Sequence, residues 1–201
     1  MKLDEWYACK GVLGLPKSLE LWRWKRLPGN VVMFLKKHNL ESSTGMFYRG
    51  IDIDLFISEV KRENNVVHID GLLEPNDRFF TLLRTLGKVS VSRRGILIQQ
   101  DFRVFVEKSG AFKLSTFSNA LRKSLKLFVG VYLRSIHCVK CGLCTQLCPS
   151  SSITISKEGV IVDESCLHCS RCNDLCPLVE YVAGDYVDCI VPKLQSSISN
   201  D

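Results

Sequence analysis

Eight of the ten cysteines in this 201-residue chain fall into two identical patterns near its C-terminal end. Each pattern is C-x2-C-x2-C-x3-C-P, and the second begins 28 positions after the first. Thiolates are soft metal ligands, and thiolates two residues apart can reach one metal centre from a single tight loop. The spacing therefore predicts metal binding by two complete sets of four ligands. These cysteines are Cys138, Cys141, Cys144, Cys148, Cys166, Cys169, Cys172 and Cys176.

Three other interpretations of these cysteines are possible. Zinc ribbons also use paired C-x2-C elements, but one zinc ion takes four ligands and does not require two tetrads with this internal spacing. Disulfides suit small secreted domains, whereas the first ten residues contain acidic side chains and no apolar signal segment. Cysteines scattered through a core would not repeat in register. Iron–sulfur ligation is favoured, with zinc and a degraded site as the remaining alternatives.

The segments CVKCGLCTQLCP (138–149) and CLHCSRCNDLCP (166–177) resemble the dicluster 4Fe-4S ferredoxin family over about residues 134–191. The resemblance implies two 4Fe-4S clusters with crossed ligands, because each fourth cysteine in that family ligates the other cluster. One departure is that Ser170 occupies the place that Gly142 has in the first motif, which crowds the second loop slightly. The implied ligands are Cys138, Cys141, Cys144 and Cys176 for the first cluster, and Cys166, Cys169, Cys172 and Cys148 for the second.

Charge is distributed unevenly along the chain. Residues 1–135 hold 23 Lys and Arg against 13 Asp and Glu, a net charge of +10, whereas residues 136–191 hold three against seven, a net charge of −4. A basic body beside an acidic cysteine module indicates two functional units, and the body could attract an anionic partner. A solvated basic surface without a partner is the alternative.

Residues 1–49 contain all three tryptophans, interleaved with basic residues, and are predicted to form a helical docking segment. Within it, GLPKSLELWRWKRLP (14–28) resembles the segment that follows the catalytic domain in archaeal phosphoadenosine-phosphosulfate reductase-like proteins. Some of those proteins continue through a small middle domain into a dicluster ferredoxin, which is also the order here. Their Ser-Gly-Gly-x-Asp-Ser phosphate loop does not occur in this sequence. The chain thus resembles the C-terminal accessory part of such proteins, and the resemblance supplies no catalytic residue.

The middle region, residues 50–135, is predicted to be an α+β domain. Its pattern indicates a helix over 54–62, a strand over 66–70 and a helix over 77–86 that is capped by Asn76. Four strands should follow, because β-branched and apolar runs alternate with turn residues. These strands are predicted at 89–92, 95–100, 103–107 and 111–115.

A long helix is expected next, capped by Ser115 or Thr116 and running almost directly into Cys138. Its apolar face is predicted to hold Phe117, Leu121, Leu125, Phe128 and Tyr132. A small hairpin at 153–156 and 160–162 lies between the cysteine motifs, residues 136–192 form the ferredoxin domain, and residues 193–201 form a flexible tail. The predicted fold class is therefore α+β: an N-terminal helical segment, a small domain with an antiparallel sheet, and a C-terminal ferredoxin-like dicluster domain.

Four further residues could take part in chemistry. Cys9 and Cys189 lie outside both motifs; each could be a redox thiol, but a lone cysteine is more often a small buried hydrophobe. His137 and His168 lie beside or within the cysteine loops, where they could tune a cluster or simply fill space. The sequence contains no Walker loop, no nucleophile elbow and no His-Glu-x-x-His motif. We therefore expect no catalysis by the chain alone.

The expected function is iron–sulfur electron transfer by two 4Fe-4S clusters. The resemblance implies an accessory subunit that delivers electrons to a phosphoadenosine-phosphosulfate reductase-like, or related, sulfur-metabolism enzyme. The redox partner would then be a nucleotide-binding reductase subunit. The alternative is a basic module that binds nucleic acid or protein and holds structural clusters. No apolar run approaches the roughly 18 residues of a membrane span, and we expect a cytoplasmic protein.

Overall fold

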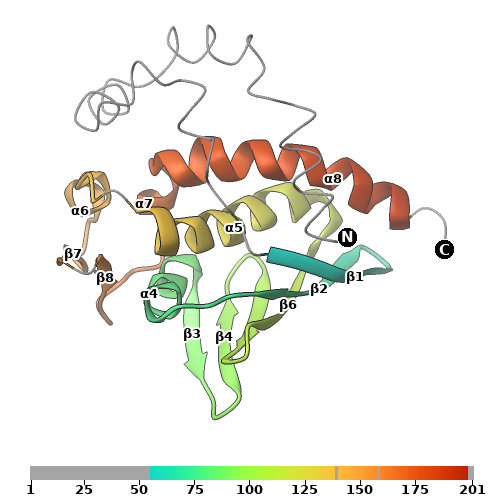
Figure 1. The fold of residues 1–201 in the computed structure, drawn as a ribbon, viewed down its shortest axis with the longest axis horizontal. Helices are drawn as coiled ribbons and strands as arrows, with labels where there is room; N and C mark the ends of the chain where they lie inside the picture. The colour runs from blue at the N-terminus through green and yellow to red at the C-terminus, as the bar shows by residue number, and fades with distance from the viewer. Residues whose placement is uncertain (1–54, 139, 158, 199–201) are drawn as a thin grey trace, which may run out of the picture.

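The computed structural model describes residues 55–138, 140–157 and 159–198. In this part of the chain, six antiparallel strands form one sheet in the order β1-β2-β6-β5-β4-β3 (Figure 1). Strands β5 and β6 alternate between buried and more exposed residues, as a sheet with one buried face requires. The strands are β1 (Leu55–Glu63), β2 (Val66–Leu73), β3 (Lys88–Val91), β4 (Gly95–Gln99), β5 (Arg103–Glu107) and β6 (Ala111–Phe117).

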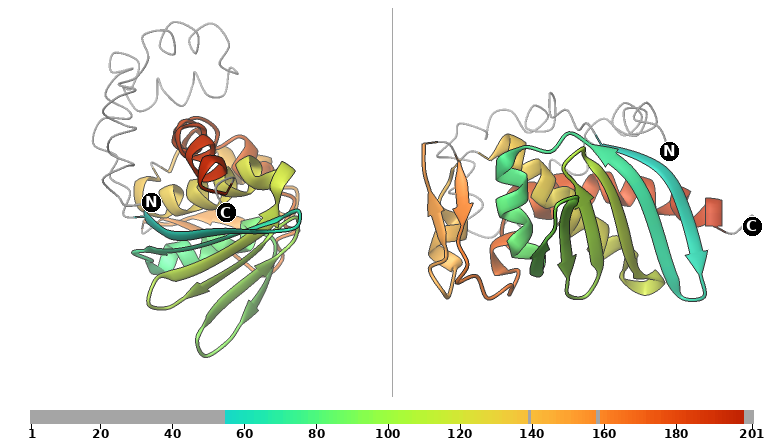
Figure 2. Two further views of the ribbon diagram at one scale, coloured as in Figure 1. Left: turned by 90° about the vertical axis from the view of Figure 1, so that its right-hand side faces the viewer. Right: turned by 90° about the horizontal axis from the view of Figure 1, so that it is seen from below.

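Helix α5 (Leu121–His137) crosses the buried face of the sheet, and α8 (Gly184–Ile198) lies on the far side of α5 (Figure 2). The short helix α4 (Asp77–Leu82) continues as the 3-10 helix η2 (Leu83–Leu86) and packs beside α5. None of the described helices has the length and apolar content that a membrane span requires.

An aromatic cluster joins α4, α5 and the sheet. Phe79 of α4 packs edge-on against Tyr132 of α5, with ring centroids 5.5 Å apart, and against Phe128, at 6.0 Å. Phe128 in turn lies 4.9 Å from Phe112 of β6. All four rings are buried, so this cluster holds α4 and α5 on the sheet through apolar burial and edge-to-face contacts.

The cysteine-rich part lies at one end of the sheet, beside α4 (Figure 1). Its β-hairpin contributes Ile153, Val160 and Val162 to a core that continues without a break from the sheet to α8. The boundary expected between 135 and 136 lies in the last turn of α5, so this helix carries the chain straight from the sheet into the first cysteine loop. The remaining elements are α6 (Leu143–Leu147), β7 (Ile153–Ile155), β8 (Val160–Val162), α7 (Arg171–Asp174) and the π-helix η4 (Leu178–Ala183).

Several sequence predictions are confirmed. The fold is a mixture of helix and antiparallel sheet, and all four strands predicted after residue 88 are present. Asn76 caps α4, because its Oδ1 accepts a hydrogen bond from the Phe79 backbone N–H at 2.9 Å. The hairpin predicted between the cysteine motifs is formed by β7 and β8.

The helix predicted over 54–62 is wrong, because residues 55–63 form β1. A β-bulge lies between Ile57 and Glu59, and it inserts one extra residue into the strand. That insertion breaks the two-residue alternation of apolar side chains and imitates a helical spacing. Pairing along β2 satisfies the backbone of β1, so tertiary pairing decides the structure of this segment.

The predicted cap of α5 at Ser115 or Thr116 is also wrong. Strand β6 runs to Phe117, the 3-10 turn η3 (Ser118–Ala120) follows, and α5 begins at Leu121 without a side-chain cap. Thr116 instead hydrogen-bonds Ser124 at 2.7 Å, and Phe117 is 55 % exposed on the sheet. The sheet continues this far because β2 pairs with β6 up to that residue.

The predicted start of the flexible tail, at residue 193, is too early in the chain. Helix α8 continues to Ile198, and Leu194 is buried against the core, so packing holds residues that look polar along the sequence. Residues 1–54, which include the tryptophan-rich segment predicted over 1–49 and Cys9, lie outside the described residues.

Gly130 of α5 provides a test of this packing. A Cβ on Gly130 would lie 2.6 Å from Val179 Cγ1 of η4, closer than real Cβ contacts. We expect Gly130→Ala to destabilise the protein by about 1–3 kcal/mol through overpacking, although Ala favours a helix by about 1 kcal/mol relative to Gly. Denaturant unfolding of the iron-loaded protein measures the change.

Gly184→Ala is the matched control, because a Cβ at Gly184 would meet only Lys126 Cε, at 4.0 Å. We expect that variant to be neutral or slightly more stable. Equal stability of the two variants would contradict close packing between α5 and η4.

Candidate metal centre

The two cysteine loops share the same unusual backbone conformation. Lys140 and His168, 28 positions apart, have φ values of 57° and 53°, and Gly142 and Ser170 have φ values of 85° and 58°. Each loop then enters a short helix, α6 or α7. Left-handed residues in such loops turn successive N–H groups toward a common point, a concavity that binds anionic groups, iron–sulfur clusters among them. The repeat seen in the sequence is therefore also a repeat of structure.

Ser170 pays a conformational cost that Gly142 does not. A residue with a Cβ in the left-handed region is disfavoured by roughly 1–2 kcal/mol. Ser170 Oγ donates a hydrogen bond of 3.4 Å to the Thr85 carbonyl, which offsets part of that cost. The predicted crowding of the second loop is thus a strained backbone with a compensating contact, and it leaves the cysteine positions intact.

Four cysteines surround one cavity at the second loop. Cys166, Cys169 and Cys172 line it together with Cys148, which belongs to the first motif. The cavity is closed on other sides by residues such as Thr85 and Ile153. The fourth cysteine of the first motif is therefore placed with the first three cysteines of the second.

The reverse placement is found at the first loop. The thiol of Cys176, from the second motif, interacts electrostatically with those of Cys138, Cys141 and Cys144. Crossed ligation requires both of these groupings. The donor set, four thiols in each group, fits two 4Fe-4S clusters, while ligation itself stays a prediction.

The described residues do not form a site for a single metal ion. No three His, Cys, Asp or Glu side chains among them converge as such an ion requires. Thiolates around one zinc ion would lie about 3.8 Å apart, given Zn–S bonds of about 2.3 Å.

Backbone and hydroxyl groups also point at the cysteine sulfurs. The backbone amide of Leu143 hydrogen-bonds Cys141, and the amides of Leu178 and Val179 hydrogen-bond Cys176. Such N–H groups stabilise negative charge on sulfur and help to set the potential of a bound cluster.

Cys148 has the most acidic thiol for which a shift is resolved. Burial raises its pKa, but hydrogen bonds from Ser152 and Ser150 lower the pKa to about 7. The hydroxyl oxygens lie 3.2 Å and 3.5 Å from the Cys148 sulfur. These two serines follow the first motif directly. The cysteine spacing alone does not predict that they hydrogen-bond the Cys148 sulfur.

For four other thiols, burial outweighs the hydrogen bonds and charges that lower the pKa, so the net pKa is raised. Burial raises the pKa of Cys172 to about 11, against the lowering influence of Arg134. Metal-free thiols with raised pKa values are protonated near neutral pH, so cluster assembly has to displace their protons. Burial also raises the pKa values of Cys141, Cys144 and Cys176.

The second loop is fastened to the end of η2. His168 Nδ1 donates to the Arg84 carbonyl at 2.6 Å, and Asn173 Nδ2 donates to the Thr85 carbonyl at 3.3 Å. The last carbonyls of a helix lack partners within the helix, and the loop supplies them here. His168 is therefore a structural anchor, which favours the simpler of the two interpretations that the sequence allowed.

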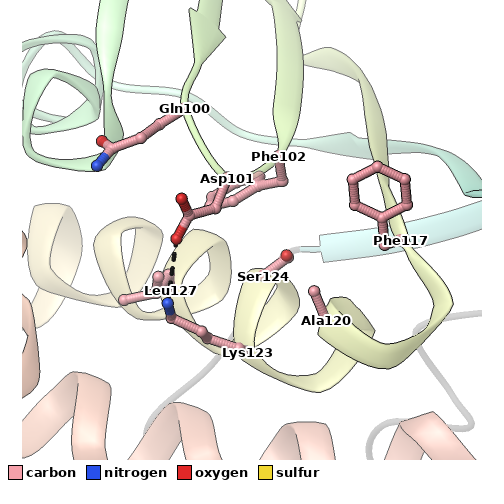
Figure 3. A pocket seen from close by; sticks show the side chains of 8 residues that line it. All are labelled: Gln100, Asp101, Phe102, Phe117, Ala120, Lys123, Ser124 and Leu127. Carbon is pink, nitrogen blue, oxygen red and sulfur yellow. Dashed lines mark hydrogen bonds and ion pairs between the residues drawn. The ribbon is translucent and has the colours of Figure 1, made fainter.

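A second hollow, of about 380 Å³, lies between the β4–β5 turn and the start of α5 (Figure 3). Lys123 and Asp101 form an ion pair of 3.1 Å across it, and the rest of its lining is mainly apolar. The paired charges neutralise each other, and no cysteine or histidine lines the hollow. The chemistry of the described residues is therefore concentrated at the cysteine loops.

Comparison with known families agrees with this location. A family model described as a 4Fe-4S dicluster domain matches residues 137–178, which include all eight motif cysteines. The match supports a ferredoxin-type domain that binds 4Fe-4S clusters, and a dicluster model is consistent with two of them. No curated protein and no solved structure matches the chain.

The crossed placement leads to a test with two pairs of variants. If Cys148 ligates the second cluster, Cys148→Ala should alter the same paramagnetic resonance signal as Cys169→Ala. Cys176→Ala should alter the same signal as Cys141→Ala, because each removes a ligand of the first cluster. Reduced, anaerobically prepared proteins are compared.

Cys189→Ala is the control, since Cys189 lies outside both motifs, and it should retain both signals. The assignment is wrong if Cys148→Ala and Cys141→Ala lose the same signal.

Proposed function

We propose that this chain is an electron carrier whose two 4Fe-4S clusters pass single electrons to a partner enzyme. The observation that carries the proposal is that the two cysteine groups adjoin. Helix α6, which carries Cys144 of the first group, packs against α7, which carries Cys172 of the second. Clusters held by neighbouring cysteines lie close enough to exchange electrons, so the pair forms a two-site path.

The second group offers a route for electrons to leave the protein. Cys169 is exposed, and the neighbouring Leu167 is 65 % exposed. An apolar contact beside a ligand suits brief docking of a redox partner, which needs close approach over a small area. We therefore place the exit at the second loop.

The partner that we propose is a phosphoadenosine-phosphosulfate reductase-like or related nucleotide-binding enzyme of sulfur metabolism. The support is the resemblance of residues 14–28 to a segment of such proteins and the order of the regions that follow. Net positive charge over residues 1–135 suits an acidic partner surface.

The cations on α5 are already paired within the chain. Arg122 forms two hydrogen bonds with Asp188, at 2.6 Å and 2.9 Å, and Lys126 pairs with Glu180. Arg93 and Arg94, in the β3–β4 turn, are exposed and form no ion pair with the acids of the described residues. The positive charge of Arg122 and Lys126 is therefore largely balanced within the chain and is less available for docking.

Cluster content is the first test of this function. We expect about eight iron and eight acid-labile sulfide per chain prepared without oxygen, because two complete tetrads are present. Dithionite should bleach the visible absorption, and air-free reoxidation should restore it. The chain alone should not reduce a sulfonucleotide, since every cluster ligand position is filled by a thiolate. Zinc with little sulfide would overturn the proposal.

Docking is tested with Leu167→Glu. A charge at this exposed position should slow electron delivery to an added sulfonucleotide reductase by at least several-fold while the cluster spectra stay unchanged. Stopped-flow absorbance measures the rate. Val91→Glu is the matched control, because Val91 is 72 % exposed and ends β3, whose hairpin extends away from the cysteine loops (Figure 1).

If Leu167→Glu and the unmodified chain deliver electrons at the same rate, the electron exit is not at the second loop. A reductase that accepts no electrons from the unmodified chain would rule out that partner and leave the electron-carrier function standing.

A further inference from the structure

A buried arginine lies between the two cysteine groups. Arg134 is in the last turns of α5 and is 2 % exposed. Its Nη1 donates a hydrogen bond to Asn173 Oδ1 and lies 3.9 Å from the Cys172 sulfur. Its Nη2 is also buried and has no hydrogen-bond acceptor among the described residues. One donor of the guanidinium is therefore left for a group other than these side chains.

No carboxylate neutralises this cation within the described part of the chain. Arg134 is absent from the ion pairs there, which join Lys, Arg or His to acids at the surface. Asn173, its nearest oxygen partner, is a neutral amide that is itself fixed by Thr85. A buried charge without a counter-charge is strongly disfavoured, so a negative group has to lie close by.

The groups that face Arg134 are the cysteines of both groups, whose thiols become negative thiolates on binding a cluster. Arg134 interacts electrostatically with Cys176, Cys172 and Cys144. Cys144 and Cys176 are grouped with the first loop, and Cys172 with the second. One guanidinium therefore faces both prospective clusters, and it is charged at any pH at which the protein is folded.

We propose that Arg134 is a fixed counter-ion shared by the two clusters and that it raises the reduction potential of both. The inference rests on the proposed function, because it requires bound clusters. A 4Fe-4S cluster with four thiolates is anionic, and each one-electron reduction adds one negative charge. A buried cation stabilises the reduced form more than the oxidised form, since screening by water is weak at that depth.

The reaction involved is electron addition alone. One electron from an external donor, here dithionite, reduces one cluster, and the donor is oxidised. No bond to Arg134 forms or breaks and no proton leaves it, so Arg134 acts only by its charge and its hydrogen bonds. It is a positioning and potential-setting residue rather than a catalytic one.

Arg134→Gln separates charge from shape, because glutamine keeps a donor for Asn173 and carries no charge. We expect this variant to lower the potentials of both clusters, with the one-electron reduction equilibrium shifting at least tenfold toward the oxidised form, about 59 mV. Arg134→Lys retains the charge and should keep most of both potentials. The readout is a redox titration of the iron-loaded protein followed by paramagnetic resonance, with iron and sulfide measured on each sample.

Arg122→Gln is the matched control. It removes the same charge from the same helix, but Arg122 is exposed and paired with Asp188. Both potentials should stay where they are in the unmodified chain.

Asn173→Asp tests the inference without touching Arg134. The substitution is nearly isosteric and places a carboxylate where the guanidinium now bonds an amide, so it should also lower both potentials.

Unchanged potentials in fully loaded Arg134→Gln would overturn the inference, as would a shift confined to one cluster. Loss of both clusters in Arg134→Gln and Asn173→Asp, with normal loading of Arg122→Gln, would assign Arg134 a structural role instead. Absence of iron from the unmodified chain is a different result, because it would overturn the proposed function itself.

Discussion

Helix α5 is enclosed on nearly all sides, and its packing is the constraint on which the rest of the structure depends. Twelve of its seventeen residues are buried, including the unbroken run from 127 to 135. One side meets the sheet and α4 through the aromatic cluster, and the other meets η4 closely enough that only glycine fits at position 130. Apolar burial on both sides fixes the helix in direction and in depth.

This constraint reaches the cysteine loops directly, because α5 ends at His137 and the first cysteine is the next residue. The second loop is held from another direction, by hydrogen bonds to the end of η2. Both loops are therefore anchored to the same core, and Arg134 interacts with cysteines of both. In the proposed electron carrier, such a frame would limit the change in geometry on reduction of a bound cluster.

The surface charge of this protein depends on the fold and does not simply follow the basic region 1–135 and the acidic region 136–191. The basic face of α5 pairs with acids of η4 and α8, which come from the acidic half of the chain. These exposed pairs contribute little stability individually, roughly 0–1 kcal/mol each. Their effect on surface charge is larger, because they neutralise cations of α5 that the composition alone would count as part of a basic surface.

Buried and exposed arginines therefore have different uses here. Arg122 and Arg134 lie three turns apart on one helix, yet one balances a surface carboxylate and the other faces sulfur. The difference follows from what each side of α5 contacts.

Local rules were sufficient for much of this protein. The cap at Asn76, the strands between Lys88 and Phe117 and the paired cysteine loops depend on residues a few positions apart, so the sequence predicts them. Prediction failed where distant partners decide the outcome. Strand β1 forms because β2 lies alongside it, and α8 extends to Ile198 because the core covers Leu194.

The sequence by itself determined the cysteines, their spacing and hence the kind of metal centre, because thiolate chemistry and loop length are local properties. The tertiary structure decided which charge faces that centre. Arg134 and Asn173 are separated by 39 positions, and Thr85 and Asn173 by 88. Nothing in the residues adjoining Arg134 distinguishes it from the exposed cations of the same helix. Its burial between the two loops exists only once the sheet, α5 and both loops have packed together, because burial is a property of neighbours in space.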